Sequence, residues 1–173
     1  MRTIGDVATG SMRLLRTFNP WQNAGYGNSI EPVSLSPDGR WIAYSTVERE
    51  GAPDRRRYLL AADGSAQRSL TSTAGISEKP VWTLDGASVL FMANWAGSFG
   101  LWSVPVQDGR PSGSPRLLTA DMGRVGPIGM TESGSYVYNY QYDGRSAVCL
   151  QVTRYQSLGS RPSHVIASFW GFC

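Results

Sequence analysis

A tandem repeat constrains the fold of this chain more than any other feature of its sequence. Residues 36–44, SPDGRWIAY, have the pattern of a tight turn followed by a strand with alternating apolar positions, and residues 83–91, TLDGASVLF, repeat that pattern. Asp38 thereby corresponds to Asp85, 47 residues later. A weaker third copy, TESGSYVY, occupies residues 131–138 and keeps the glycine but not the aspartate. Repeats of this length indicate a structure built from stacked supersecondary units.

The second half of each unit recurs as well. The apolar runs at residues 58–62 and 101–106 each lead to an Asp-Gly pair, at residues 63–64 and 108–109. Asp-Gly between apolar runs is a strong hairpin signal, because glycine adopts the positive φ of a tight turn. Each unit therefore predicts four short strands joined by hairpins, which is the content of a β-propeller blade. No segment shows a sustained helical period with caps, so we expect little helix.

These units resemble the TolB-like, or PD40, family of WD40-like propeller repeats. The hallmark of that family is a turn and strand of the form S-P-D-G-[RK]-x-[IL]-[AV]-[YF], which residues 36–44 match almost fully. The second copy has Leu84 where the hallmark has proline, and the third has Ser133 in place of the aspartate. The resemblance covers most of residues 5–152 and implies a propeller. Such blades occur in translocation-complex proteins, peptidase propeller domains and regulators, so the resemblance leaves the activity open.

We predict an all-β chain with a half blade followed by three four-stranded antiparallel blades, at residues 4–16, 30–71, 79–119 and 127–170. Most aromatic side chains are expected to fill the wedges between neighbouring blades. About three and a half blades do not readily close a ring, since single-ring propellers have about four to eight. We therefore predict a homodimer that closes a ring of about seven blades. The alternatives are a piece of a longer protein, or four sheets that close tightly with residues 4–16 completing the last.

Composition and charge exclude several classes of protein. Hydrophobic residues make up 41% of the chain and charged residues 17%, which argues against disorder. The net charge of +3 at pH 7 is too small to indicate a nucleic-acid partner. We expect no membrane span, because no apolar run approaches about 18 residues, and residues 1–6 show no signal peptide. The compartment is left open, because relatives with signal peptides are exported.

Three residues are candidates for binding or catalysis. Trp95 lies in a glycine-rich loop and is the aromatic residue that we expect to be most exposed, so it is a candidate ligand contact. Arg56 is the centre of the only basic run, residues 55–57, which we interpret mainly as a solvated loop with local charge pairing. His164 is the only histidine and could act as a lone general base, although a structural role is more common for such a residue.

Acidic residues at the entries of the innermost strands suggest a metal site. Glu31 and Glu78 precede the first strands of successive blades, and Asp121 follows the last strand of one. Acids converging on one mouth of the central channel could bind Ca²⁺, which takes six to eight oxygen ligands. Solvated loop acids are the plainer interpretation of all three.

Four further aspartates belong to Asp-Gly turns, where the carboxylate accepts hydrogen bonds from backbone N–H groups. We assign a purely structural role to this set, which consists of Asp38, Asp63, Asp85 and Asp108.

Two functions of different classes follow, and whether the chain is an enzyme stays open. The first is a scaffold that binds a protein or small-molecule ligand at its channel face, because rigid blades carry variable loops. The second is a hydrolase of small esters or lactones, in which Ca²⁺ at the channel mouth polarises the carbonyl and activates water.

Overall fold

The computed structural model describes residues 2–5, 12–23, 33–52, 54–73, 75, 77–122, 125–142 and 145–151. Within these residues the chain consists of antiparallel strands and one short 3₁₀ helix, η1 (Pro20–Asn23). This confirms the all-β prediction and the expected scarcity of helix. In the described part of the chain, no helix has the length and hydrophobicity needed to cross a lipid bilayer.

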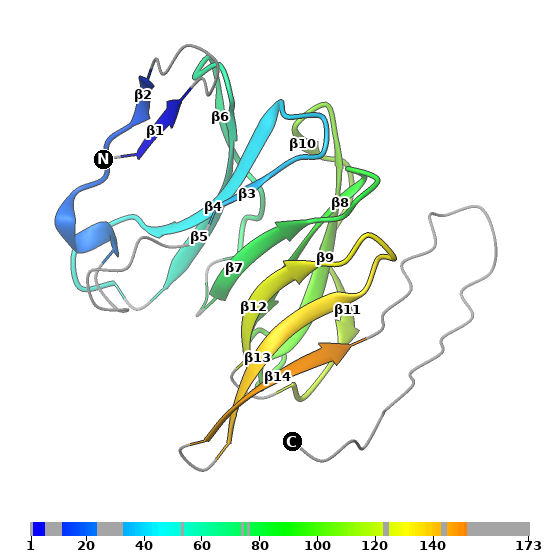
Figure 1. The fold of residues 1–173 in the computed structure, drawn as a ribbon. Coiled ribbons are helices and arrows are strands. Elements are labelled where there is room, and N and C mark those ends of the chain that lie inside the picture. Colours follow the sequence, from blue (N-terminus) through cyan, green and yellow to red (C-terminus); the bar gives the residue numbers. More distant parts are fainter. Residues whose placement is uncertain are drawn as a thin grey trace.

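The strands form four sheets in chain order (Figure 1). The first sheet pairs two strands, β1 (Arg2–Gly5) and β2 (Met12–Arg16). The second sheet has four strands in the order in which they occur, β3 (Ser34–Leu35), β4 (Trp41–Val47), β5 (Arg55–Ala61) and β6 (Gln67–Ser69).

The third sheet repeats this arrangement with one added short strand. It contains β7 (Ser77–Trp82), β8 (Ser88–Ala93), β9 (Gly100–Gln107), β10 (Arg110–Pro111) and β11 (Arg116–Thr119), and both β10 and β11 pair with β9. The fourth sheet contains β12 (Val125–Met130), β13 (Tyr136–Tyr142) and β14 (Arg145–Gln151). The rest of the last predicted blade, up to residue 170, lies outside the described residues.

The first strands of the last three sheets lie side by side, since β7 contacts both β3 and β12 (Figure 1). This is the place of the innermost strands in a propeller. Residue Glu78 lies inside β7, opposite Met92, rather than before the strand. The register shifts between Glu78 and Val81, and Pro80 in this stretch cannot donate to the ladder, which favours such an irregularity.

The turns after these inner strands explain why the repeat was visible in the sequence. The N–H of the first turn residue donates to a carbonyl five residues later, from Ser36 to Trp41 at 2.7 Å and from Thr83 to Ser88 at 2.9 Å. In the third copy the partner of Thr131 is only four residues away. The turn glycines have φ of 71°, 67° and 80°, a region that favours glycine.

Side chains from both faces of the third sheet form the core. Every residue of β8 is buried. Alternate side chains of a strand point to opposite faces, so both faces of β8 are covered, one by each of two core clusters. One cluster lies between the second and third sheets and contains Trp41, Ala43, Leu59, Ala61, Leu70, Trp82, Val89, Phe91, Ala93, Val104 and Val106. The other lies between the third and fourth sheets and contains Leu90, Met92, Leu101 and Tyr136. Aromatic residues between sheets were predicted, and Trp41, Trp82, Phe91 and Tyr136 are indeed buried.

Arg68 and Trp41, both in the second sheet, contact the third sheet at Asp108 and Gly109. The Arg68 guanidinium lies 4.7 Å from the centre of the Trp41 ring, and its Nη1 donates to the carbonyls of Asp108 at 2.7 Å and Gly109 at 3.2 Å. Gly109 lies so close to the Trp41 ring that an added Cβ would be 2.0 Å from Cε2 of that ring. The hairpin turn between β9 and β10 is thus held against Trp41.

Another arginine, Arg57, is buried between the same two sheets. Arg57 has no exposed surface, and its guanidinium lies 4.4 Å from the Phe91 ring centre and 4.8 Å from that of Trp95. Its Nη1 donates to Thr71 Oγ1 at 3.1 Å and to the Thr73 carbonyl at 3.2 Å. Burial lowers the pKa of Arg57 to about 9, so the side chain still carries its charge at neutral pH.

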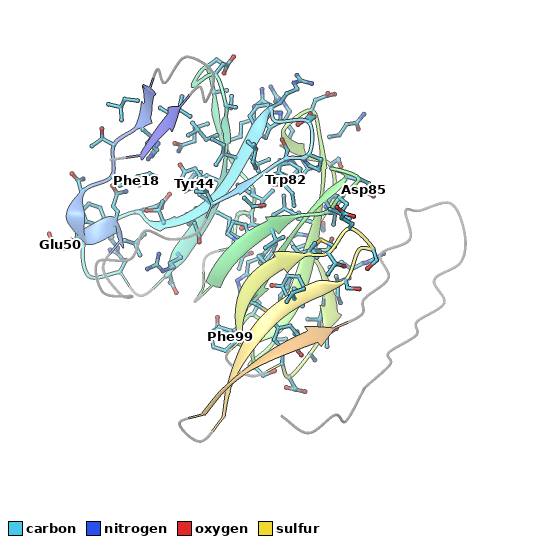
Figure 2. All side chains as sticks on the ribbon, viewed as in Figure 1. Phe18, Tyr44, Glu50, Trp82, Asp85 and Phe99 are labelled. Carbon is cyan, nitrogen blue, oxygen red and sulfur yellow. The ribbon has the colours of Figure 1, made fainter. Side chains whose placement is uncertain are left out.

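The first sheet packs against the second through aromatic side chains (Figure 2). Phe18, which follows β2, meets Tyr44 edge-on at 5.5 Å, and Tyr44 stacks on Tyr58 at 5.6 Å. Arg16 lies 5.2 Å above the Phe18 ring and donates to Gln67. These contacts place the two-stranded sheet beside the second sheet as a neighbouring blade would be.

Candidate functional site

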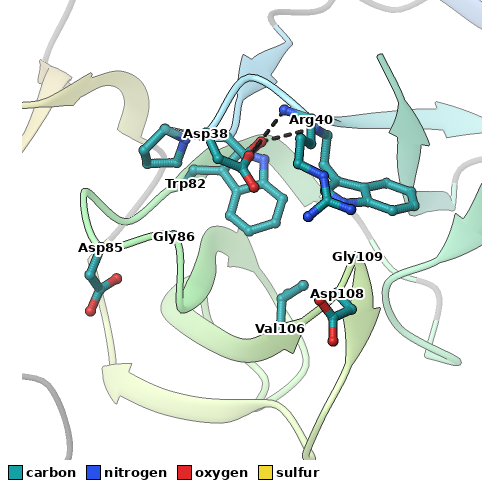
Figure 3. A pocket seen from close by; sticks show the side chains of 11 residues that line it. Asp38, Arg40, Trp82, Asp85, Gly86, Val106, Asp108 and Gly109 are labelled. Carbon is teal, nitrogen blue, oxygen red and sulfur yellow. Dashed lines mark hydrogen bonds between the residues drawn. The ribbon is translucent and has the colours of Figure 1, made fainter. Parts of the chain in front are cut away.

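A pocket of about 200 Å³ opens where the turns of the second and third sheets meet (Figure 3). We call it the first pocket. It is formed by the turns that follow β3 and β7 and by the turn between β9 and β10. The lining residues are Ser36, Pro37, Asp38, Arg40, Trp41, Trp82, Asp85, Gly86, Val106, Asp108 and Gly109.

A second pocket, of about 220 Å³, lies between the third and fourth sheets. It is formed by the turns after β7 and β12, and its lining residues are Thr83, Leu84, Asp85, Met130, Glu132, Ser133 and Gly134. Asp85 lines both pockets. The two pockets therefore follow one another along the same edge of the molecule, next to the innermost strands.

The turn aspartates use one carboxylate oxygen to hold their own turn. Asp38 Oδ1 accepts from Ser36 Oγ at 2.5 Å and from the Arg40 N–H at 3.0 Å (Figure 3). Asp85 Oδ1 accepts from Thr83 Oγ1 at 2.7 Å and from the backbone N–H of the residue at position 87 at 2.9 Å. The predicted turn role is confirmed for both. No described residue donates to Oδ2 of either carboxylate.

These hydrogen bonds also keep a negative charge at the first pocket. The hydrogen bond from the Ser36 hydroxyl, followed by that from the Arg40 backbone N–H, lowers the pKa of Asp38 below its ordinary value of 3.8. A carboxylate that accepts such bonds is stabilised in its charged form. Asp38 is therefore ionised at any pH near neutrality.

The lining of the two pockets is acidic although the chain as a whole is basic. Among the described residues, four acidic residues line them, Asp38, Asp85, Asp108 and Glu132, against one basic residue, Arg40. The whole chain has a net charge of +3. Arg68 contacts the Asp108 carbonyl but does not line either pocket.

Apolar surface accompanies these charges. Trp41 and Trp82 are 8% and 5% exposed and form the buried wall of the first pocket. Leu84, on the wall of the second pocket, is 45% exposed. The indole Nε1 of Trp82 is buried and has no hydrogen-bond partner among the described residues.

The purely structural role that we predicted for Asp38, Asp85 and Asp108 missed that these residues also line pockets. The sequence signal for the pockets is the repeat itself, because it sets successive turns side by side.

Trp95 is partly exposed and contributes to the packing between sheets. Its ring is only partly exposed and packs edge-on against Phe91 at 5.4 Å and Trp102 at 5.1 Å. Gly75 makes room for it, because an added Cβ there would lie 2.8 Å from Trp95 Nε1. The side chain contributes to the packing between the second and third sheets, and a ligand contact by Trp95 stays a prediction.

The basic run at residues 55–57 is a strand rather than a solvated loop. It begins β5, so its side chains alternate between the two faces of the sheet, and Arg55 and Arg57 are buried at 6% and 0% exposure. The solvated-loop interpretation was wrong for these two residues. The expected charge pairing is confirmed for Arg56, whose Nε lies 2.9 Å from Oε2 of Glu48. A binding role for Arg56 stays a prediction.

Tyr58 contacts the same glutamate as Arg56. The Tyr58 hydroxyl donates to Glu48. Burial, with this hydrogen bond as a smaller cause, raises the pKa of Tyr58 to about 12.

The calcium site also stays a prediction. Glu31 and His164 lie outside the described residues, and for Glu78 only the backbone position in β7 is described. Asp121 is exposed, with a φ of 52°, just after β11. Among the described residues, no group of three or more His, Cys, Asp or Glu side chains could hold a metal ion.

Comparison with known proteins supports the fold. No protein-family model matches the sequence. A protein of Bacillus subtilis (strain 168) described as uncharacterized peptidase YuxL is 37% identical over 71 residues, which is 41% of this chain and 10% of that protein. The crystal structure of TolB from Acinetobacter baumannii matches with a TM-score of 0.65 and 19% identity, over 86% of this chain and 34% of TolB. The chain thus spans about a tenth of the first protein and a third of the second, and it has a TolB-like β-propeller fold.

Proposed function

We propose that this chain is a TolB-like propeller scaffold that binds a segment of another protein at the two pockets beside its innermost strands. The observation that carries this proposal is the pair of adjacent pockets that share Asp85. Rigid blades that present turns of varied sequence are suited to recognition. The fold itself is compatible with many activities, so the argument rests on the pockets.

The size of the pockets favours a protein segment over a small-molecule ligand. Their volumes are about 200 and 220 Å³, below the range of about 300–1,000 Å³ that is usual for small-molecule sites. Each pocket is suited to one side chain. Two side-chain pockets in a row fit an extended segment, which presents alternate side chains to one face.

A peptide array probed with the purified chain tests this function. Asp85→Arg places a long side chain between the two pockets and should abolish binding of peptides that the unmodified chain retains. Asp63→Arg is the matched control, because Asp63 also accepts from a turn N–H, that of Ser65 at 2.8 Å, but lines neither pocket. Equal binding by both variants, or no binding of any peptide, contradicts the proposal.

We further propose that two chains join to complete a ring. Among the described residues the first sheet has two strands, whereas the second has four, and Phe18, which follows the first sheet, contacts Tyr44 of the second. A second chain could supply the strands that complete it. Light scattering at micromolar concentration should give twice the 18.8 kDa of one chain, and a single-chain mass would overturn this assembly.

The calcium-dependent hydrolase remains an untested alternative. Its test is lactone or ester hydrolysis that is lost with a chelator and with Glu31→Ala or Glu78→Ala. The word peptidase belongs to the description of YuxL, of which this chain matches 10%, and we propose no peptidase activity here.

A further inference from the structure

We propose that the bound segment places a basic side chain, of lysine or arginine, in the first pocket and an apolar side chain in the second, two residues apart. This inference rests on the proposed function and names the chemistry of the partner. It concerns the same two pockets and assigns a different role to each.

Charge selects the occupant of the first pocket. Among the described residues, Asp38, Asp85 and Asp108 line it, against one basic residue, Arg40. In Asp38 and in Asp85, the carboxylate oxygen Oδ2 accepts no hydrogen bond from a described residue. A cationic side chain entering from solvent would meet these oxygens first, whereas a carboxylate would be repelled by all three groups.

The aromatic wall of the first pocket supports the same occupant. Arg68 already lies over the Trp41 ring at 4.7 Å, which shows that a guanidinium is accommodated in these surroundings. Trp82, the other indole of the wall, has no such cation among the described residues. Indole faces attract cations when these approach within about 6 Å.

An unsatisfied donor in the wall gives a second and independent reason to expect a ligand. The Nε1–H of Trp82 has no acceptor among the described residues, although the side chain is only 5% exposed. Buried donors without partners are rare because each one costs free energy. Because this nitrogen has almost no exposed surface, a main-chain carbonyl of the bound segment would become its acceptor when the pocket wall shifts on binding.

The second pocket combines acidic residues with exposed apolar surface. Leu84 and Met130 line it beside Asp85 and Glu132, and Leu84 leaves 45% of its surface exposed. Burying this leucine beneath an apolar side chain removes hydrocarbon from water, which is favourable. Because Asp85 lines both pockets and an extended chain directs alternate side chains to one face, the two occupants are spaced as residues i and i+2.

Fluorescence anisotropy with short labelled peptides tests this chemistry on the full chain. The reference peptide is Gly-Ser-Lys-Ser-Leu-Ser-Gly, and two others replace its lysine by glutamate or its leucine by serine. The reference peptide should bind tightest. The glutamate peptide should bind at least about tenfold more weakly, because like charges face each other, and the serine peptide should also bind more weakly.

Charge-neutral variants assign the effect to the first pocket. Asp85→Asn keeps the turn acceptor but loses the charge, and it should weaken binding of the lysine peptide by up to about fivefold, as for an exposed ion pair. Asp38→Asn should act in the same direction, and Asp63→Asn should change nothing. Equal binding of the lysine and glutamate peptides, or identical affinities for Asp85→Asn and Asp63→Asn, overturns this inference while leaving the proposed function intact. Failure of every peptide to bind overturns both.

Discussion

Replacing Gly109 by alanine tests how the second and third sheets are joined. Gly109 has a φ of 65°, and a Cβ there would lie 2.0 Å from Cε2 and 2.1 Å from Cζ2 of Trp41. Trp41 is 8% exposed and belongs to the core cluster between these sheets. The added methyl group therefore cannot be accommodated unless the indole ring or the hairpin turn moves.

The expected cost has two parts. A left-handed backbone conformation costs a residue with a Cβ about 1–2 kcal/mol, and overpacking a core typically costs about 1–3 kcal/mol more. The free energy of unfolding should therefore fall by about 2–5 kcal/mol. At about 2–4 °C per kcal/mol for a chain of this size, the melting temperature should drop by roughly 4–20 °C.

Gly51→Ala is the matched control for the backbone part. Gly51 has a φ of 72°, and an added Cβ would meet nothing within 4 Å, so only the conformational cost of about 1–2 kcal/mol applies. Both variants are compared with the unmodified chain by thermal and urea unfolding, followed by circular dichroism. If Gly109→Ala is no less stable than Gly51→Ala, the turn between β9 and β10 does not pack on Trp41, and the described packing of the two sheets is refuted.

Three other outcomes follow from single side chains. Arg68→Ala should lower the free energy of unfolding by about 1–3 kcal/mol, since it removes a cation from the Trp41 face and leaves two carbonyls without their donor; urea unfolding unchanged from the unmodified chain would contradict this. The folded-state pKa of Asp38 is lowered, so its stabilising effect is present above the unfolded pKa of about 3.9 and is lost as the pH falls through the folded value. The difference in free energy of unfolding between the unmodified chain and Asp38→Asn should accordingly shrink below about pH 4. A difference that widens there would contradict the lowered pKa of Asp38. Burial raises the pKa of Tyr58 to about 12, so its contribution to stability is complete below about pH 10 and is lost as the pH rises through 12. Ultraviolet titration should show one late tyrosine that is missing in Tyr58→Phe, and a Tyr58→Phe variant that still shows the late tyrosine would refute this assignment.

The turns and strands of the repeat could be predicted because their signals are local. The Asp-Gly turns depend on the positive φ of glycine and on a carboxylate two residues from the N–H that it accepts from, and both features lie within a few residues of sequence. Alternating apolar positions then indicate which segments are strands. For this reason the position of Asp38 in its turn was correctly predicted before any contact between sheets was known.

The burial of the two arginines could not be predicted in the same way. Arg55 and Arg57 are buried because they occupy alternate positions of β5, whereas three successive arginines in a sequence suggest a solvated surface. The cost of burying the Arg57 charge is offset by contacts of its guanidinium with two aromatic rings and with Thr71. These partners come from other segments of the chain, so only the assembled sheets reveal them.

The pockets escaped prediction for a related reason. Each turn aspartate has a sufficient structural role in its own hairpin, and nothing local shows that the turn after β3 faces the turn after β7. That proximity follows from the packing of consecutive sheets, which sets Asp38, Asp85 and Asp108 around one cavity. A repeated acidic turn in successive blades is the sequence signal that could have suggested it.

The binding role of this edge is tested most directly by the indole resonances in a nitrogen–proton correlation spectrum. The chain has six tryptophans, and the signal of Trp82 is assigned by its absence from Trp82→Phe. Titration with the lysine peptide should shift the Trp82 indole signal, because its Nε1–H gains an acceptor, and Asp85→Arg should suppress that shift. An unchanged Trp82 signal at saturating peptide, or a shift confined to Trp95 and Trp102, would contradict binding at these pockets.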